Sequence, residues 1–151
     1  MFVSSLFMLA AAVEPMDTNN DLKVQPKNQF ENRGNARIAF ESMIRTFAVK
    51  SEGQDDILYL DTGAGKWYRA PLTCFGMGDP RTAMQILPIS HGTGIDKFTR
   101  FKLLGLGRNE TNECTINDLI ELLPQETVEF GLESQKNVDK RAANIAVRKS
   151  Q

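Results

Sequence analysis

Short runs of β-branched and aromatic residues follow one another through the middle of the chain. Residues 44–49 place their side chains alternately on two faces, and residues 57–60 are apolar throughout, which are patterns typical of β-strands. Residues 66–72 also form two faces, and Pro71, which lacks an N–H donor, is expected to end that strand or to lie at an edge. Further extended segments are expected at residues 86–89, 98–104 and 114–116.

Polar and glycine-containing segments separate these runs. Two glycines in residues 61–65 predict a hairpin turn, because glycine readily adopts the positive φ angles that tight turns require. Asp79 and Pro80 predict the N-cap and first residue of a short helix. Residues 118–123 are predicted to form another short helix, which Pro124 would end.

These elements predict an α+β fold that is mainly β, either a small antiparallel sheet or a partly open barrel, with one or two short helices. The chain has 151 residues, which fits one domain. We expect that domain at residues 36–124, preceded by a mobile leader at residues 13–35 in which Phe30 would dock. Residues 125–151 are expected to be a charged C-terminal tail, solvated and at most a frayed helix.

Residues 2–13 form an uncharged apolar run that is shorter than the roughly 20 residues needed to span a bilayer. The run ends in alanines, and Ala10 and Ala12 fit the small-x-small pattern that signal peptidases cleave. We therefore predict a signal peptide at residues 1–12. No lysine or arginine precedes the run, so an N-terminal core helix is the alternative.

The composition excludes several classes of protein. The formal net charge of -1 gives no basic field for nucleic acid. The two cysteines, Cys74 and Cys114, would form one disulfide in an oxidising compartment, or would be two buried free thiols in a cytosolic protein. Their spacing and the single histidine argue against a metal site. Residues 63–66 (GAGK) lack the first glycine and the Ser or Thr of a phosphate-binding loop, so no cofactor is expected.

One motif is typical of an enzyme. Residues 58–64 (LYLDTGA) match the aspartic-protease signature, and residues 104–109 are similar to the glycine–arginine segment of retroviral-type proteases. This resemblance implies a homodimer in which Asp61 of each subunit shares a proton and activates a water molecule. However, the interval between the motifs is shorter than the family usually has, and residues 65–69 place charge and bulk where the family has a small apolar segment.

Trp67, Tyr68 and Arg69 are candidates for a binding patch, because these residue types often anchor interfaces. The alternative is that Trp67 or Tyr68 belongs to the core on its face of the strand, since large aromatic side chains are mostly buried.

The run from Trp67 to Cys74 (WYRAPLTC), with Cys114 and Ile116 further along, resembles an uncharacterised family of small exported bacterial proteins, classed as a domain of unknown function. The similarity covers roughly residues 38–123. The resemblance implies an exported protein in which the two cysteines are paired. It implies no known reaction, so no catalytic residue follows from it.

We therefore expect an exported, periplasmic or secreted, non-enzymatic domain with an interaction or envelope-associated role, whose partner would be an envelope protein. The alternative is a homodimeric aspartic protease that uses Asp61. A second alternative is a small-ligand binder that uses the mouth of a partly open barrel. Nucleic acid, cofactors and a transmembrane span are not expected.

Overall fold

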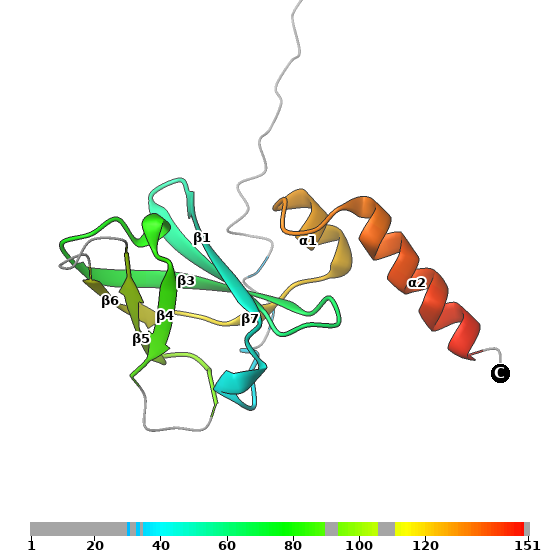
Figure 1. Ribbon diagram of the computed structural model, residues 1–151, viewed down its shortest axis with the longest axis horizontal. Coiled ribbons are helices and arrows are strands. Elements are labelled where there is room, and N and C mark those ends of the chain that lie inside the picture. Colours follow the sequence, from blue (N-terminus) through cyan, green and yellow to red (C-terminus); the bar gives the residue numbers. More distant parts are fainter. Residues whose placement is uncertain (1–29, 31–32, 34, 90–93, 106–110, 150–151) are drawn as a thin grey trace, which may run out of the picture.

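The computed structural model describes residues 30, 33, 35–89, 94–105 and 111–149 of the chain. An antiparallel sheet curls into a half-barrel, and two helices follow it (Figure 1). The mainly β fold with a partly open barrel, predicted from the sequence, is therefore confirmed. The strands are β1 (Thr46–Glu52), β2 (Asp55–Asp61), β3 (Trp67–Gly76), β4 (Gln85–Pro88), β5 (Arg100–Leu104), β6 (Thr111–Ile116) and β7 (Ile120–Glu121). The helices are α1 (Pro124–Glu129) and α2 (Gln135–Lys149), with short 3-10 helices η2 (Glu41–Met43) and η3 (Pro80–Thr82).

The strands lie in the order β1-β2-β3-β6-β5-β4, and β7 pairs with β3 beyond the end of β6. The first three strands are consecutive hairpins in which Thr46 faces Asp61 and Tyr59 faces Arg69. The chain then crosses from β3 to the far edge as β4 and returns through β5 to β6. β3 therefore lies in the middle of the sheet and pairs with strands from both halves of the chain.

β3 is covered on both of its faces. Its residues from Trp67 to Ala70 are all buried. Because side chains alternate across a strand, Tyr68 and Ala70 point to one face while Trp67 and Arg69 point to the other. Antiparallel sheets commonly leave one face in water, so the second cover over β3 needs further elements of the chain.

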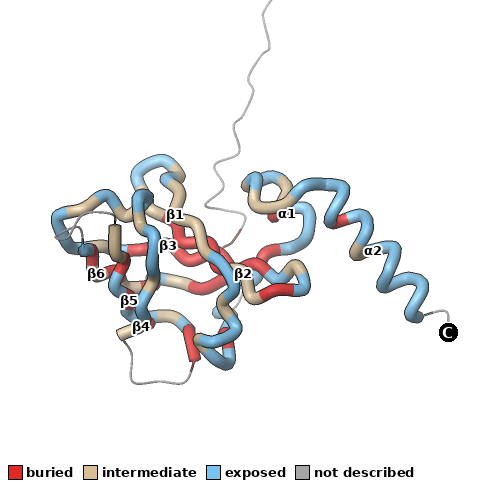
Figure 2. The backbone as a smooth tube through the Cα atoms, viewed as in Figure 1, coloured by how far each residue is buried: buried red, intermediate tan, exposed pale blue. Residues whose placement is uncertain are grey.

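Two clusters of buried side chains provide these covers. Figure 2 shows where the buried residues lie along the backbone. We call the larger one the sheet core, to which β2, β3, β5 and β6 all contribute. Its buried members are Ile38, Leu58, Leu60, Tyr68, Ala70, Leu72, Ile95, Phe101, Leu103, Cys114, Ile116 and Leu119. We call the smaller one the helix core, which lies between the other face of β2 and β3, β7 and the segment around α1. Its buried members are Phe30, Ile57, Tyr59, Trp67, Ile120 and Leu122, with Phe130 and Leu132 packed against them.

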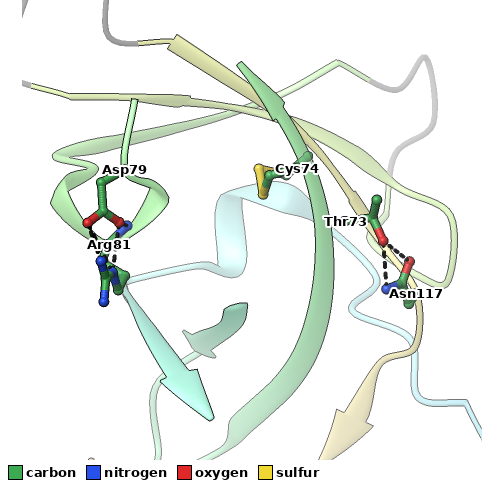
Figure 3. Close-up of a disulfide and its surroundings, with 6 residues drawn as sticks. Thr73, Cys74, Asp79, Arg81 and Asn117 are labelled. Atoms are coloured by element: carbon green, nitrogen blue, oxygen red, sulfur yellow. Dashed lines mark hydrogen bonds and ion pairs between the residues drawn. A yellow bond between two sulfur atoms is a disulfide. The ribbon is translucent and has the colours of Figure 1, made fainter. Parts of the chain in front are cut away.

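The proline in β3 does not end the strand, contrary to the sequence prediction. β3 continues to Gly76, and it is the partner strand that breaks, between the end of β6 and the start of β7. The carbonyl of Pro71 accepts the Asn117 N–H at 2.8 Å within this break. Since a residue in an antiparallel ladder directs its N–H and C=O to the same neighbour, the missing donor of Pro71 falls where the ladder is already interrupted. Asn117 Nδ2 also donates to Thr73 Oγ1 at 3.0 Å (Figure 3).

The helix predicted at residues 118–123 is absent, and that prediction is wrong. The segment continues in extended form as β7, and Pro124 begins α1 instead of ending a helix. The reason is the two-sided burial, because Leu119 enters the sheet core while Ile120 and Leu122 enter the helix core. When a short apolar run is buried on two sides, its periodicity cannot show whether it is a strand or a helix.

The connection from β3 to β4 contains the predicted helical turn, η3. Asp79 caps it by accepting the Arg81 N–H at 3.0 Å, and Pro80 is its first residue, as predicted. Hydrogen bonds from the Arg81 side chain and backbone lower the pKa of Asp79 to about 2 (Figure 3). η3 contacts β1. The two ends of the curled sheet are thus linked through this connection.

The charged C-terminal tail forms the 15-residue helix α2, which is more regular than the frayed or solvated terminus expected from the sequence. Val138 is its buried residue, and most of its length extends away from the sheet (Figure 1). Among the residues that the structure describes, no helix is both long enough and apolar enough to cross a membrane.

Cys74 and Cys114 form a disulfide, so the predicted pairing is confirmed (Figure 3). The two residues face each other directly across β3 and β6, with their Cα atoms 4.0 Å apart. Cys114 is fully buried in the sheet core, and Cys74 is partly buried against it. The bond therefore joins two strands that the sheet topology already pairs.

We expect removal of this disulfide to destabilise the fold without changing its topology. The bond closes a loop with a sequence separation of 40, for which loop-closure entropy gives about 4 kcal/mol of stabilisation. Urea unfolding of Cys74→Ala/Cys114→Ala should show a free energy of unfolding lower by about that amount.

The matched control is the wild-type protein kept reduced by a thiol reductant, which lacks the bond but keeps the sulfur atoms. A loss below about 1 kcal/mol in both samples would contradict the loop-closure account.

Candidate functional site

The three predicted binding residues lie in the interior. Trp67 and Arg69 belong to the helix-core face, Tyr68 belongs to the sheet core, and each is at most 7% exposed. The two aromatic side chains are thus core residues on opposite faces of one strand, which is the alternative drawn from the sequence. A role of these residues in binding stays a prediction, and it requires a partner that reaches the helix core.

Asp61, the candidate protease residue, lies at the end of β2 and begins the predicted hairpin. Its Oδ1 accepts the Gly63 N–H at 2.6 Å, and Thr62 N–H donates to the Lys66 carbonyl at 3.0 Å. The backbone has positive φ at Gly63 (83°), Ala64 (54°) and Gly65 (76°). The carboxylate therefore stabilises its own turn, and the two glycines supply the conformation that other residues adopt only with strain.

Two arginines lie against this turn. The guanidinium of Arg45 occupies the space that a side chain at Gly63 would fill, and that of Arg141 does the same at Gly65. Arg141 belongs to α2, so the C-terminal helix contacts the hairpin turn through this side chain. The Asp-Thr-Gly-Ala-Gly segment thus has a structural role, whether or not Asp61 acts in catalysis.

A buried polar cluster lies on the helix-core face of the sheet. Arg69 Nη2 donates to Glu52 Oε2 at 2.5 Å, and the Tyr59 hydroxyl donates to the same carboxylate. Burial, together with that hydrogen bond to Glu52, raises the pKa of Tyr59 above its ordinary value. Arg69 Nε is buried and has no hydrogen-bond partner among the described atoms. Such an unpaired donor costs about 1–3 kcal/mol, so the cluster is not fully satisfied.

Phe30 packs against this cluster from the N-terminal side. It is 4% exposed, which confirms that this residue of the leader docks. Its ring lies 4.7 Å from the guanidinium carbon of Arg69 and 6.1 Å from the centre of the Phe130 ring. A guanidinium over an aromatic face gains electrostatic attraction that grows when water is excluded, as it is here.

Arg33 makes the second contact of the same segment. Its Nη1 and Nη2 donate to Glu126 Oε2 and Oε1 at 2.7 and 2.8 Å, and Nη1 also donates to the Glu121 carbonyl at 3.2 Å. Glu126 is 4% exposed and accepts the Leu123 N–H at 2.7 Å, which caps α1. A bidentate pair of this kind selects arginine over lysine by geometry.

Glu133 attaches α2 to the sheet. It accepts the Trp67 Nε1–H at 3.2 Å and both terminal nitrogens of Arg141, with Nη1 at 2.7 Å. The Arg141 hydrogen bonds, helped by that of Trp67, hold the pKa of Glu133 below its ordinary value. One carboxylate therefore joins β3, the start of the helix and the hairpin turn against which Arg141 lies.

Glu52, Arg33, Glu126 and Glu133 were not singled out from the sequence. For Glu52 the signal was Arg69, a charge in a largely apolar strand, which implies a buried acidic partner. Three predicted features lie outside the described residues: the predicted signal peptide at residues 1–12, most of the predicted leader, and the part of the glycine–arginine segment beyond residue 105. Within the described part, no group of three or more His, Cys, Asp or Glu side chains could hold a metal ion.

Comparison with known proteins adds no relative. No family model, no curated protein and no solved structure matches this chain. The resemblance to exported proteins of unknown function stays a prediction, and the function has to be argued from the chemistry of the chain itself.

We expect acid to release α2 from the sheet. A glutamate whose pKa is lowered in the folded state stabilises the fold above its unfolded pKa, which is about 4.3. That contribution is lost as the pH falls through the still lower folded pKa of Glu133. Trp67 is the only tryptophan, so its fluorescence should be constant from neutral pH down to about 5 and change below about 4.

Glu133→Gln is the matched control, because it keeps an acceptor but removes the charge. We expect it to lower the free energy of unfolding by about 1–2 kcal/mol at neutral pH and to abolish the acid transition of Trp67. A wild-type transition that persists unchanged in this variant would show that another group is responsible.

We expect Glu52→Ala to be strongly destabilising. The substitution leaves Arg69, whose side chain is 6% exposed, without its carboxylate. Breaking a buried ion pair from one side costs about 3–5 kcal/mol, and urea unfolding should give a value near the lower end because Glu52 keeps some contact with solvent.

The control is Glu52→Leu/Tyr59→Phe/Arg69→Met, which replaces the whole polar cluster by apolar groups of similar size. It should lie within about 1.5 kcal/mol of the wild type, since apolar replacement of a complete buried pair is often neutral. A triple variant as unstable as Glu52→Ala would indicate that the charges themselves are required.

Proposed function

We propose that the chain is an exported, periplasmic or secreted, non-enzymatic domain that acts by binding another protein of the cell envelope. The observation that carries this proposal is the disulfide between Cys74 and Cys114. Disulfides persist in oxidising compartments and are rare in the cytosol. The apolar run at residues 2–13 supports the same route, since it has the length and the small-residue end of a signal peptide.

The non-enzymatic part of the proposal is supported by how three arginine-paired carboxylates of the described residues are used. Glu52, Glu126 and Glu133 each accept hydrogen bonds from an arginine, and each contact joins elements of the fold. Catalytic acids and bases generally need a carboxylate that is free to exchange a proton with a substrate. The Arg141 hydrogen bonds hold the pKa of Glu133 below its ordinary value, so this carboxylate is a poor proton donor.

The Asp61 protease gains no support from this geometry. The carboxylate caps its own turn, and Arg141 lies on the same turn. Two aspartates that share a proton depend on mutual repulsion without a nearby cation to neutralise it. The small-ligand alternative likewise rests on the sequence alone, because the interior of the curled sheet is filled by the side chains of the sheet core.

An intact-mass measurement tests the proposal. The full-length chain is expressed in a bacterium that has a periplasm, and the mass is taken with and without reduction and alkylation. We expect periplasmic protein that begins near Val13 and takes up alkylating reagent only after reduction. Full-length cytosolic protein with two alkylatable thiols would refute the proposal.

The matched control places Leu6→Arg/Leu9→Arg in the apolar run. Two charges in a signal-type core should block export, so this variant should stay in the cytosol at full length. Export of the variant at the wild-type level would show that residues 2–13 do not direct it.

A further inference from the structure

Two side chains of the N-terminal segment fill a site formed by the rest of the domain. Phe30 lies against Arg69 and Phe130, and Arg33 is held by Glu126. We call Phe30 and Arg33 the anchors. We call the groups that receive them the anchor site: Arg69, Phe130, Glu126 and the Glu121 carbonyl.

The anchors are held by their side chains. Arg33 N–H donates to the Phe30 carbonyl at 3.1 Å, so this backbone bond lies within the segment itself. Among the described residues, the first backbone bond from this segment to the sheet region is that of Ala36 N–H to the Leu119 carbonyl, at 2.6 Å. The anchor site therefore recognises an aromatic ring and a guanidinium three residues apart, in the way that peptide-binding sites recognise spaced side chains.

The site is built for this recognition. The Glu126 carboxylate is nearly fully buried and presents both oxygens to the guanidinium, which gives strength and selectivity for arginine. The face of the aromatic ring meets a cation that is itself buried. These contacts are chemically specific, whereas packing alone would need only an apolar side chain.

The fit of the anchors is incomplete. Among the described residues, Arg69 Nε stays buried without a hydrogen-bond acceptor while Phe30 covers the guanidinium. A phenyl ring offers no conventional acceptor to this donor. An occupant with an oxygen beside its aromatic group would satisfy it, so the chain's own segment is not the best ligand that the site could take.

From these contacts we infer that the anchor site binds a peptide segment of a partner protein, in which an aromatic residue is followed three positions later by arginine. Phe30 and Arg33 occupy the site within the chain until such a partner replaces them. This inference rests on the proposed function as a protein-binding domain and names the site and the partner chemistry.

The chain's own anchors compete with an added peptide for the anchor site. A tethered segment acts at an effective concentration on the order of millimolar, so a free peptide competes poorly with the chain's own anchors. Removing the anchors should therefore strengthen binding of an added peptide by about tenfold or more. Binding by a partner would release Phe30 and Arg33 from the anchor site.

The test uses the full chain with Phe30→Ala/Arg33→Ala and a fluorescein-labelled peptide with the sequence of residues 24–35. Fluorescence anisotropy should show binding that is about tenfold or more tighter than to the wild type. A peptide with lysine in place of the arginine should bind about tenfold more weakly, because it loses the bidentate contact. We call Phe30→Ala/Arg33→Ala the open variant. Adding Glu126→Gln to the open variant should weaken binding while keeping the acceptor that caps α1.

Three results would overturn the inference. One is no binding to the folded open variant at about 1 mM peptide. Another is equal binding of the arginine and lysine peptides. The third is a wild-type dimer that Phe30→Ala/Arg33→Ala dissolves, because the occupant would then be a second copy of this chain.

Circular dichroism and the intact disulfide establish that the open variant is folded. Where it is not, Arg33→Lys replaces it, since this variant keeps Phe30 and loses only the bidentate contact. It should bind the peptide more tightly than the wild type, and a folded Arg33→Lys that binds no better would also overturn the inference.

The two proposals fail in different experiments. If the protein is exported and oxidised but its open variant does not bind the peptide, the inference about the anchor site is refuted and the proposed function is not. If the protein is cytosolic and reduced but its open variant binds the peptide, the export proposal is refuted and the inference about the anchor site is supported.

Discussion

The burial of β3 on both faces is the constraint on which the rest of this structure depends. Four consecutive residues, from Trp67 to Ala70, need cover on two sides. The curled sheet covers one side, because its other strands turn their apolar residues toward Tyr68 and Ala70. The other side is covered by β7, the segment around α1 and Phe30, so elements outside the barrel complete the burial of this strand.

The helix core surrounds the charged side chain of Arg69 as well as the ring of Trp67. Arg69 points into the helix core, and its presence explains the acidic and hydroxyl groups of Glu52 and Tyr59 around it. Buried charges need partners that make hydrogen bonds. The same chemistry recurs at Arg33 with Glu126, which joins the N-terminal segment to α1, and at Arg141 with Glu133, which also accepts the Trp67 Nε1–H of β3.

The elements with local signals could be predicted from the sequence. The hairpin of β2 and β3 follows from alternating residues around a glycine turn, and the capped turn at Asp79 follows from one dipeptide. The charged contacts depend on residues that meet only in the folded chain, such as Arg33 and Glu126, which are 93 positions apart. No pattern within a short window encodes such a pair. The helix expected before Pro124 failed for the same reason, since the covers on its two sides come from distant segments.

The facing position of Cys74 and Cys114 also has a consequence for how β3 and β6 find their alignment. A slip of one residue between paired strands turns every side chain to the opposite face, which would put one sulfur inside the barrel and the other outside. Only the native alignment brings both thiols to the same side at bonding distance. Oxidation therefore favours the native register. The disulfide forms only where β3 and β6 are correctly aligned, and misaligned strands keep free thiols and can still change their pairing.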